Sequence, residues 1–217
     1  MDGCFHGYST PMGGPSLYFH KVLVQAAQAP LADRLDNLCY IERVYACLTS
    51  WGVHRFDNPN ARLVAFQDFR VELGQLREPL TELEGLRLEE LTDHEFEHAA
   101  QLLGQQMDDI KIAAAAWPFV ANSKLLHHLL PHLVPPMDRQ YTLQYFIGRR
   151  DDHHNPPSYT FRHLFKSFWR AAVANREGLV ARVVDDEWEP PQAWHTCVPK
   201  LLDNAIFVAV PPHGGAG

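Results

Sequence analysis

The stretch VANSKLLHHLLPHLVPPMDRQYTLQYF, residues 120–146, carries the pattern that decides the fold. Its apolar residues recur at spacings of three and four, which is the period of a helix. We predict a helix over about 122–130, a proline-rich turn, and a second helix over about 136–147. The second helix begins at a proline, so that Asp138 is its third residue, where the positive helix end favours a carboxylate. The stretch therefore presents Lys124 and Asp138 on consecutive helices.

The same spacing dominates the rest of the chain, and only Gly178–Val184 has the character of a strand. Further helices are predicted from Asp33 to Gly52, around Leu63–Leu73, from Asp93 to Ala114 before Pro118, behind Thr160 as a cap, and over Pro199–Ala209. The segment 149–159 is typical of an exposed loop. The sequence thus predicts an all-α bundle of one or two lobes, a single domain over 1–217 with frayed ends at 1–15 and 211–217.

The amino-acid composition excludes several classes of protein. The chain has 217 residues, of which 46% are hydrophobic and 21% charged, which is globular and excludes disorder, collagen and coiled coil. The longest nearly apolar run, Ile112–Ala121, contains Pro118 and has about half the length a bilayer requires. The first residues form no basic, apolar leader. We therefore expect a soluble, cytoplasmic monomer without a membrane partner.

Charge is distributed unevenly along the chain. The net charge is −7, yet Lys111 to Arg182 holds ten Lys or Arg against four Asp or Glu, a balance of +6. The remaining residues carry −13. The middle segment therefore has the charge of a nucleic-acid-binding face, although solvated helix faces give the same distribution.

Cysteine spacing excludes several classes of site. The four cysteines form no C-x-x-C pair, and Cys39 and Cys47 lie eight residues apart on one predicted helix. That separation is about 12 Å, beyond the reach of a disulfide. Structural disulfides, zinc ribbons and iron–sulfur clusters are thus disfavoured, and we expect inert core cysteines.

The thirteen histidines raise the question of a metal site. His94 to His98 fits H-E-x-x-H, in which two imidazoles one helical turn apart bind zinc and Glu95 acts as a base. However, Asp93 looks like the helix cap, which places the pair in an exposed first turn, and no glutamate follows Glu97 until Glu177. We interpret the motif as a solvated, acidic helix start, with a zinc-dependent hydrolase as an alternative.

Two other histidine clusters are His127–His128 with His132, and His153–His154. Pro131 interrupts the helix between His128 and His132, so these side chains need not share a face. We interpret both clusters as polar surface or phosphate-contacting residues. No metal ligand and no cofactor are predicted.

The central stretch resembles a known family. Residues 120–124 are similar to the end of the hairpin in the helix-hairpin-helix DNA glycosylases of the endonuclease III superfamily, and residues 136–139 to the segment with their catalytic aspartate. The resemblance covers about 30 of the 217 residues. The hairpin glycines are absent, with Ala121 in their place, and the spacing from Lys124 to Asp138 is short. These departures favour an atypical substrate, such as a bulky modified base of phage DNA removed in repair or antiviral defence.

The resemblance implies a role for each residue. Asp138 would stabilise the oxocarbenium-like transition state and orient water. Lys124 would form a Schiff base with the sugar, which is the basis of AP-lyase activity. The backbone amides of Asn122 and Ser123 would hold a phosphate oxygen.

Other residues complete the predicted interface with double-stranded DNA. Trp51 and Tyr141 are assigned to a pocket for the flipped base. The cationic residues assigned to phosphates are Arg139, Arg149, Arg150, Arg162 and Lys166. Lys200, Asp203 and Asn204 share a helical face and form either a polar site or a surface salt bridge.

Each of these residues also has a purely structural interpretation, and the predicted function has two alternatives. Asp138 after a proline is also an ordinary helix cap, Lys124 a surface lysine, and Tyr141 a core residue. The sequence predicts a DNA N-glycosylase that uses Asp138 and Lys124. The alternatives are a non-catalytic nucleic-acid-binding protein and the zinc hydrolase built on His94, Glu95 and His98.

Overall fold

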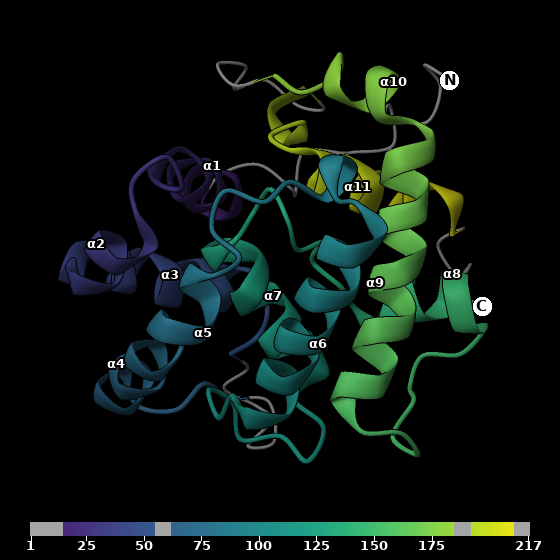
Figure 1. Cartoon of the computed structure of the whole chain (residues 1–217). Coiled ribbons are helices and arrows are strands. Elements are labelled where there is room, and N and C mark those ends of the chain that lie inside the picture. The colour runs from purple at the N-terminus through teal and green to yellow at the C-terminus, as the bar shows by residue number, and fades with distance from the viewer. Residues whose placement is uncertain (1–14, 55–61, 185–191, 211–217) are drawn as a thin grey trace.

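The computed structural model describes residues 15–54, 62–184 and 192–210, and within these residues the chain is helical (Figure 1). Its elements are α1 (Pro15–Ala26), α2 (Leu31–Asp36), α3 (Leu38–Ser50), α4 (Phe66–Gln75), α5 (Arg77–Thr81), η4 (Leu88–Glu90), α6 (Asp93–Asp109), α7 (Phe119–Leu129), η5 (Arg139–Leu143), α8 (Gln144–Ile147), α9 (Pro157–Ala174), α10 (Arg176–Val180), η6 (Gln192–Trp194) and α11 (Val198–Ala209). No strand forms among them, apart from an isolated bridge between Leu63 and Ala113. The predicted all-α class is confirmed.

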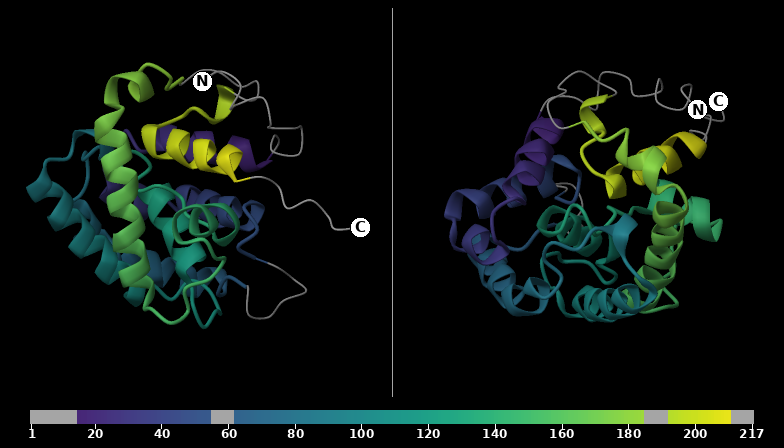
Figure 2. Two further views of the ribbon diagram at one scale, coloured as in Figure 1. Left: turned by 90° about the vertical axis from the view of Figure 1, so that its right-hand side faces the viewer. Right: turned by 45° about the horizontal axis from the view of Figure 1, so that its top comes forward.

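The two longest helices, α6 and α9, pack along one another (Figures 1 and 2). Phe96 of α6 stacks on Trp169 of α9, with ring centroids 4.2 Å apart, and on Phe165 at 5.5 Å. Further along, Gly104 gives the Arg162 side chain room to lie across α6, because a Cβ on Gly104 would stand 3.0 Å from Arg162 Cδ. Burial of these large rings makes the pair the framework of the bundle.

The central helix of the bundle is α7, which contacts α1, α3, α6 and α9. Phe119, Leu125, Leu126 and Leu129 have no exposed surface, and most of the helix is buried on all sides. Since a helix that is enclosed in this way cannot shift without disturbing its neighbours, α7 is a rigid support for any side chain that it carries.

The last elements cover the first helix. Leu17 of α1 packs with Ala193 and Trp194 of η6, and Phe207 and Val208 of α11 add to this small apolar cluster. Figure 2 shows α11 and α1 together on one side of the bundle. None of the helices in the described ranges has the length and hydropathy needed to cross a bilayer.

Several predicted boundaries were wrong, each for a local reason. The single helix over Asp33–Gly52 is two, α2 and α3, because Asn37 takes an extended conformation and caps α3 through the amides of Cys39 and Tyr40. The helix from Asp93 ends at Asp109, where Ile110 is extended, so that Ala114 lies beyond it.

The remaining differences concern helix starts and one strand. The cap of α9 is Pro156, not Thr160, because Pro157 has no amide hydrogen to lose at the first helical position. Leu63 lies outside α4, in the bridge to Ala113. Gly178–Val184, the one predicted strand, begins inside α10. The predicted frayed ends lie outside the described residues, except Pro15, which is the first residue of α1.

Candidate functional site

Asp138 is the N-cap of η5, one residue before the helix, and not the third helical residue that the sequence predicted. The backbone at Asp138 is extended, with φ −134° and ψ 172°, as is usual for the residue that caps a helix. Its Oδ1 accepts hydrogen bonds from the amides of Tyr141, at 2.7 Å, and Thr142, at 3.3 Å. The Asp138 amide donates to Thr142 Oγ1. The partly exposed carboxylate is therefore held in one orientation.

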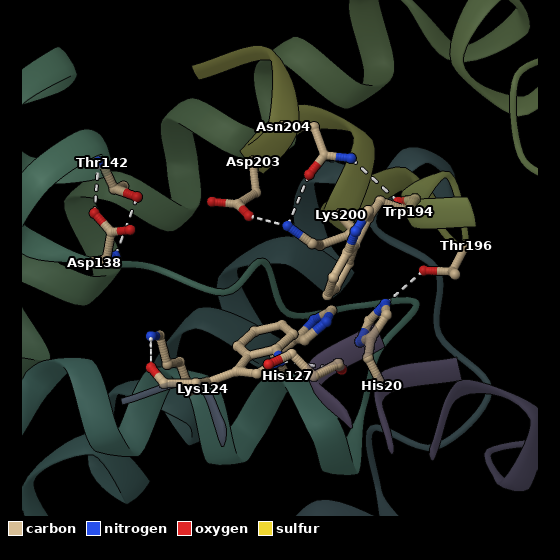
Figure 3. A network of polar contacts seen from close by, with 12 residues as sticks. His20, Lys124, His127, Asp138, Thr142, Trp194, Thr196, Lys200, Asp203 and Asn204 are labelled. Atoms are coloured by element: carbon tan, nitrogen blue, oxygen red, sulfur yellow. Dashed lines mark hydrogen bonds and ion pairs between the residues drawn. The ribbon is translucent and has the colours of Figure 1, made fainter. Parts of the chain in front are cut away.

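Lys124 lies on α7 and faces Asp138 (Figure 3). Its Nζ donates to the Trp51 carbonyl oxygen at 3.0 Å and stands 5.6 Å from the centre of the Trp51 ring. Burial lowers the pKa of Lys124 from its ordinary value, while the carboxylates of Asp138 and Asp203 act in the opposite direction. The two predicted catalytic side chains are thus close enough to interact.

Ser123 explains why Lys124 and Asp138 meet. Its Oγ donates to the Met137 carbonyl oxygen at 3.0 Å, so the segment before Asp138 is tied to α7 one residue before Lys124. Ser123 is buried inside the helix, as is Asn122. The Asn122 amide already donates to the Pro118 carbonyl oxygen, and it lies within α7 instead of at a hairpin. The hairpin-type phosphate contact predicted for this pair therefore lacks a free amide at Asn122.

Asn122 instead fastens α7 to the end of α6. Its Nδ2 donates to the carbonyl oxygens of Met107 and Ile110, both at 3.1 Å, at a fully buried position. We expect Asn122→Ala to lower the free energy of unfolding by about 1–3 kcal/mol, because two buried carbonyl groups lose their donor. Chemical denaturation measures this loss. Gln105→Ala, at an exposed position of α6, is the control and should change it by less than about 0.5 kcal/mol.

A second lysine and aspartate lie beside the first pair. Lys200, which is 5% exposed, donates from Nζ to Asp203 Oδ2 at 2.5 Å and to Asn204 Oδ1 at 2.7 Å. Asn204 in turn donates to the Trp194 carbonyl oxygen. Burial raises the pKa of Asp203, and Lys200 opposes that shift. Of the two interpretations offered by the sequence, the burial of Lys200 matches a polar site and not a surface salt bridge.

We call Lys124, Asp138, Lys200 and Asp203 the lysine–aspartate cluster. Trp51, the C-cap of α3, lies between its lysines, since Lys200 Nζ is 5.7 Å from the centre of the same ring. The cluster therefore combines two cations, two carboxylates and an indole face, drawn from α3, α7, η5 and α11.

Tyr141, the other residue predicted for a base pocket, borders the cluster. Its ring packs on Phe207 with centroids 4.2 Å apart and is partly exposed. Burial and the neighbouring Asp138 raise the pKa of its hydroxyl. Tyr141 thus remains protonated and able to donate a hydrogen bond near Asp138.

The predicted phosphate-binding side chains lie at the surface. Arg139 stands over the Trp117 ring at 5.5 Å, and Arg149 forms an ion pair with the buried carboxylate of Asp152. Arg150 and Arg162 are exposed, and Lys166 is partly exposed. Arg149 is consequently a structural partner of Asp152 as well as a surface cation.

The H-E-x-x-H motif is part of a helix cap. Thr92 caps α6, and the Glu95 carboxylate accepts from the Thr92 amide and hydroxyl, at 2.9 and 2.7 Å. These bonds lower the pKa of Glu95. His94 and His98 are exposed, and His98 lies 3.4 Å from Glu82. Since Glu95 is engaged by the cap, the geometry gives no support to the zinc hydrolase alternative.

Sequence reasoning missed His20 and misjudged His127 and His128. The three imidazoles are buried together beside Trp51 and Trp194, and His20 stacks on His127 with centroids 5.4 Å apart. The predicted surface role for His127 and His128 was therefore wrong. Their place within the apolar run LLHHLL was the available signal, because such a run on an enclosed helix buries both.

Comparison of the chain with protein-family models, curated proteins and solved structures found no match.

Proposed function

We propose that this chain is a DNA glycosylase that excises a damaged or modified base, with an associated AP-lyase activity. The observation that carries the proposal is the approach of Lys124, an amine of lowered pKa, to the capped carboxylate of Asp138 beside the Trp51 ring. Both residues are partly exposed. Perturbed titratable groups of this kind mark reactive sites.

Asp138 has the properties that N-glycosidic cleavage requires. The bond from C1′ to the base breaks with its electron pair on the base, and positive charge develops on the deoxyribose. A carboxylate whose orientation is fixed beforehand stabilises that charge without reorganisation. Water then adds to C1′, and its proton leaves through Asp138. The two amide bonds to Oδ1 provide the fixed orientation.

Lys124 provides the lyase step. Its neutral amine adds to C1′ of the abasic deoxyribose in its ring-opened aldehyde form, and loss of water gives an imine. Loss of a C2′ proton then breaks the bond from C3′ to the phosphate oxygen, and water hydrolyses the imine to regenerate Lys124. Burial favours the neutral amine, as in other lysines that form Schiff bases.

Double-stranded DNA is the proposed partner, contacted by surface cations that follow Asp138 in the chain. Arg139, Arg150, Arg162 and Lys166 supply positive charge and have, among the described residues, no buried acidic partner of the kind that holds Arg149. Their contacts would be with phosphates, so binding should weaken steeply with salt.

The proposal is tested by incubating the chain with duplexes that carry a panel of damaged and hypermodified bases, including bulky bases of the phage type. We expect abasic sites to form with at least one of them. Salt-sensitive duplex binding without release of any base would instead identify a non-catalytic nucleic-acid-binding protein.

The imine gives a prediction for Lys124. Borohydride should trap a covalent complex between the wild-type chain and DNA with an abasic site, and Lys124→Met should abolish it. Because the reactive form is the neutral amine and its pKa is lowered, trapping should rise with pH and level off below the usual lysine pKa of about 10.4. Gel analysis at several pH values measures this. Lys111→Met, at an exposed lysine, is the control and should trap normally.

A further inference from the structure

His20, His127 and His128, which we call the histidine cluster, are buried and bring one ring nitrogen each to within 4.8 Å of the others. His20 comes from α1, and the other two from the enclosed helix α7. Figure 3 shows His20 and His127 beneath the segment that carries Trp194 and Thr196. The cluster thus joins residues that lie more than a hundred positions apart in the chain.

In each imidazole, one nitrogen, which we call the outer nitrogen, contacts a hydrogen-bonding group outside the histidine cluster, and the other, the inner nitrogen, contacts none in the described part of the chain. His127 Nδ1 lies 2.7 Å from the Val134 carbonyl oxygen, which only accepts, so Nδ1 carries the proton and Nε2 a lone pair. His20 Nε2 lies 2.7 Å from Thr196 Oγ1. Because the Thr196 hydroxyl donates to Cys197 Sγ, it accepts from His20, and His20 Nδ1 likewise carries a lone pair.

His128 completes the set. Its Nε2 lies 3.4 Å from Cys47 Sγ, and a proton on Nε2 donated to that sulfur leaves a lone pair on Nδ1. The remaining nitrogens, His20 Nδ1, His127 Nε2 and His128 Nδ1, are buried and have no hydrogen-bond partner among the described residues. Outer nitrogens anchored to neighbours and inner nitrogens left open are the arrangement of histidines that bind metal ions.

Neither a proton nor a water molecule satisfies three lone pairs. A proton on one ring nitrogen can be shared with at most one other ring nitrogen. One water molecule donates only two hydrogen bonds. A cation, by contrast, accepts all three lone pairs, and neutral imidazole is the form that coordinates metals.

We propose that the histidine cluster is a zinc-binding site with three imidazole ligands. Tetrahedral zinc with bonds of about 2.0–2.1 Å requires nitrogens roughly 3.4 Å apart, so the rings need to close by little more than about 1 Å. No cysteine or carboxylate of the described segments joins the three at this distance, which leaves the fourth position to water or a small ligand. The site is independent of the proposed glycosylase and differs from the sequence prediction of no metal.

Carboxylates offset the positive charge near the ion. Lys124 and Lys200 act on the cluster electrostatically; Lys200 forms an ion pair with Asp203, and Asp138 and Asp203 act electrostatically on Lys124. The metal would connect α1 to α7, with its outer contacts on α3 and on the segment before α11. We therefore expect zinc to fix the first helix on the core.

The experiment measures metal content and stability on tag-free protein. We expect about one zinc per chain by mass spectrometry. A strong chelator should remove it and lower the Tm by at least about 5 °C, and added zinc should restore it. A chain that takes up no zinc from a stoichiometric zinc solution, with an unchanged Tm, would overturn the proposal.

Matched variants locate the site. His127→Gln should lose the zinc, whereas the double variant His94→Gln, His98→Gln should retain it, as should His132→Gln. Loss of zinc in the H-E-x-x-H variant instead would place the metal there and overturn the assignment. Should His127→Gln fail to fold, cobalt in the wild-type chain decides: its spectrum should show nitrogen ligation without a thiolate charge-transfer band, and such a band would contradict the proposal.

Discussion

Asp138→Asn is expected to reduce the rate of base release at least about 100-fold, while the fold survives. Loss of one preorganised electrostatic group from a reacting centre commonly costs this much. The fold survives because asparagine caps helices as well as aspartate does, and its side-chain oxygen can keep the bonds to the Tyr141 and Thr142 amides. Single-turnover release of base from the substrate found in the panel measures the effect.

The substitution distinguishes the two interpretations of Asp138, because asparagine keeps the helix cap but removes the negative charge that catalysis requires. The loss of stability should not exceed about 1 kcal/mol, the usual contribution of a carboxylate to a helix start. Asp151→Asn, at an exposed loop position, is the matched control and should leave both quantities unchanged. If Asp138→Asn released the base at the wild-type rate, Asp138 would be a helix cap without a catalytic role.

Local sequence patterns predicted the fold class but not every helix boundary. The spacing of apolar residues correctly predicted helices at α3, α6, α9 and α11. The break at Asn37 was missed because the apolar period continues across it, and only the capping preference of asparagine signals a new start. Likewise the proline before Asp138 was taken as a helix start, although Asp138 has the extended backbone of an N-cap and the helix begins only at Arg139.

The sequence predicted only those members of the candidate site that lie close together in the chain. Lys124 and Asp138 were proposed as a pair because they belong to one short stretch with a recognisable spacing. Lys200 was recognised as polar, but its burial depends on Trp51 and Trp194, which are contacts made only in the folded chain. His20 has no motif around it and meets His127 through the packing of α1 on α7, which a single sequence does not encode locally.

Arg34→Met is expected to be the most destabilising of the substitutions considered, lowering the free energy of unfolding by about 3–5 kcal/mol. Arg34 is 5% exposed, and its guanidinium donates to the carbonyl oxygens of Ala29 and Leu129 and to the Tyr40 hydroxyl. It also lies 3.7 Å from Glu84. Methionine fills similar space but leaves these acceptors without their donor and the Glu84 carboxylate without its cation, with only the Leu31 amide still donating to it.

A surface ion pair supplies the control for Arg34. Arg77 pairs with Asp36, but their side chains are 39% and 68% exposed, so Arg77→Met should cost no more than about 1 kcal/mol. For a chain of this size the loss at Arg34 corresponds to a fall in Tm of roughly 6–20 °C, measurable by calorimetry. Equal stability of the two variants would mean that the buried guanidinium does not hold α2, α3 and the end of α7 together. In that case the Asn122 bonds to the end of α6 and the packing of its apolar side chains would hold α7 in place.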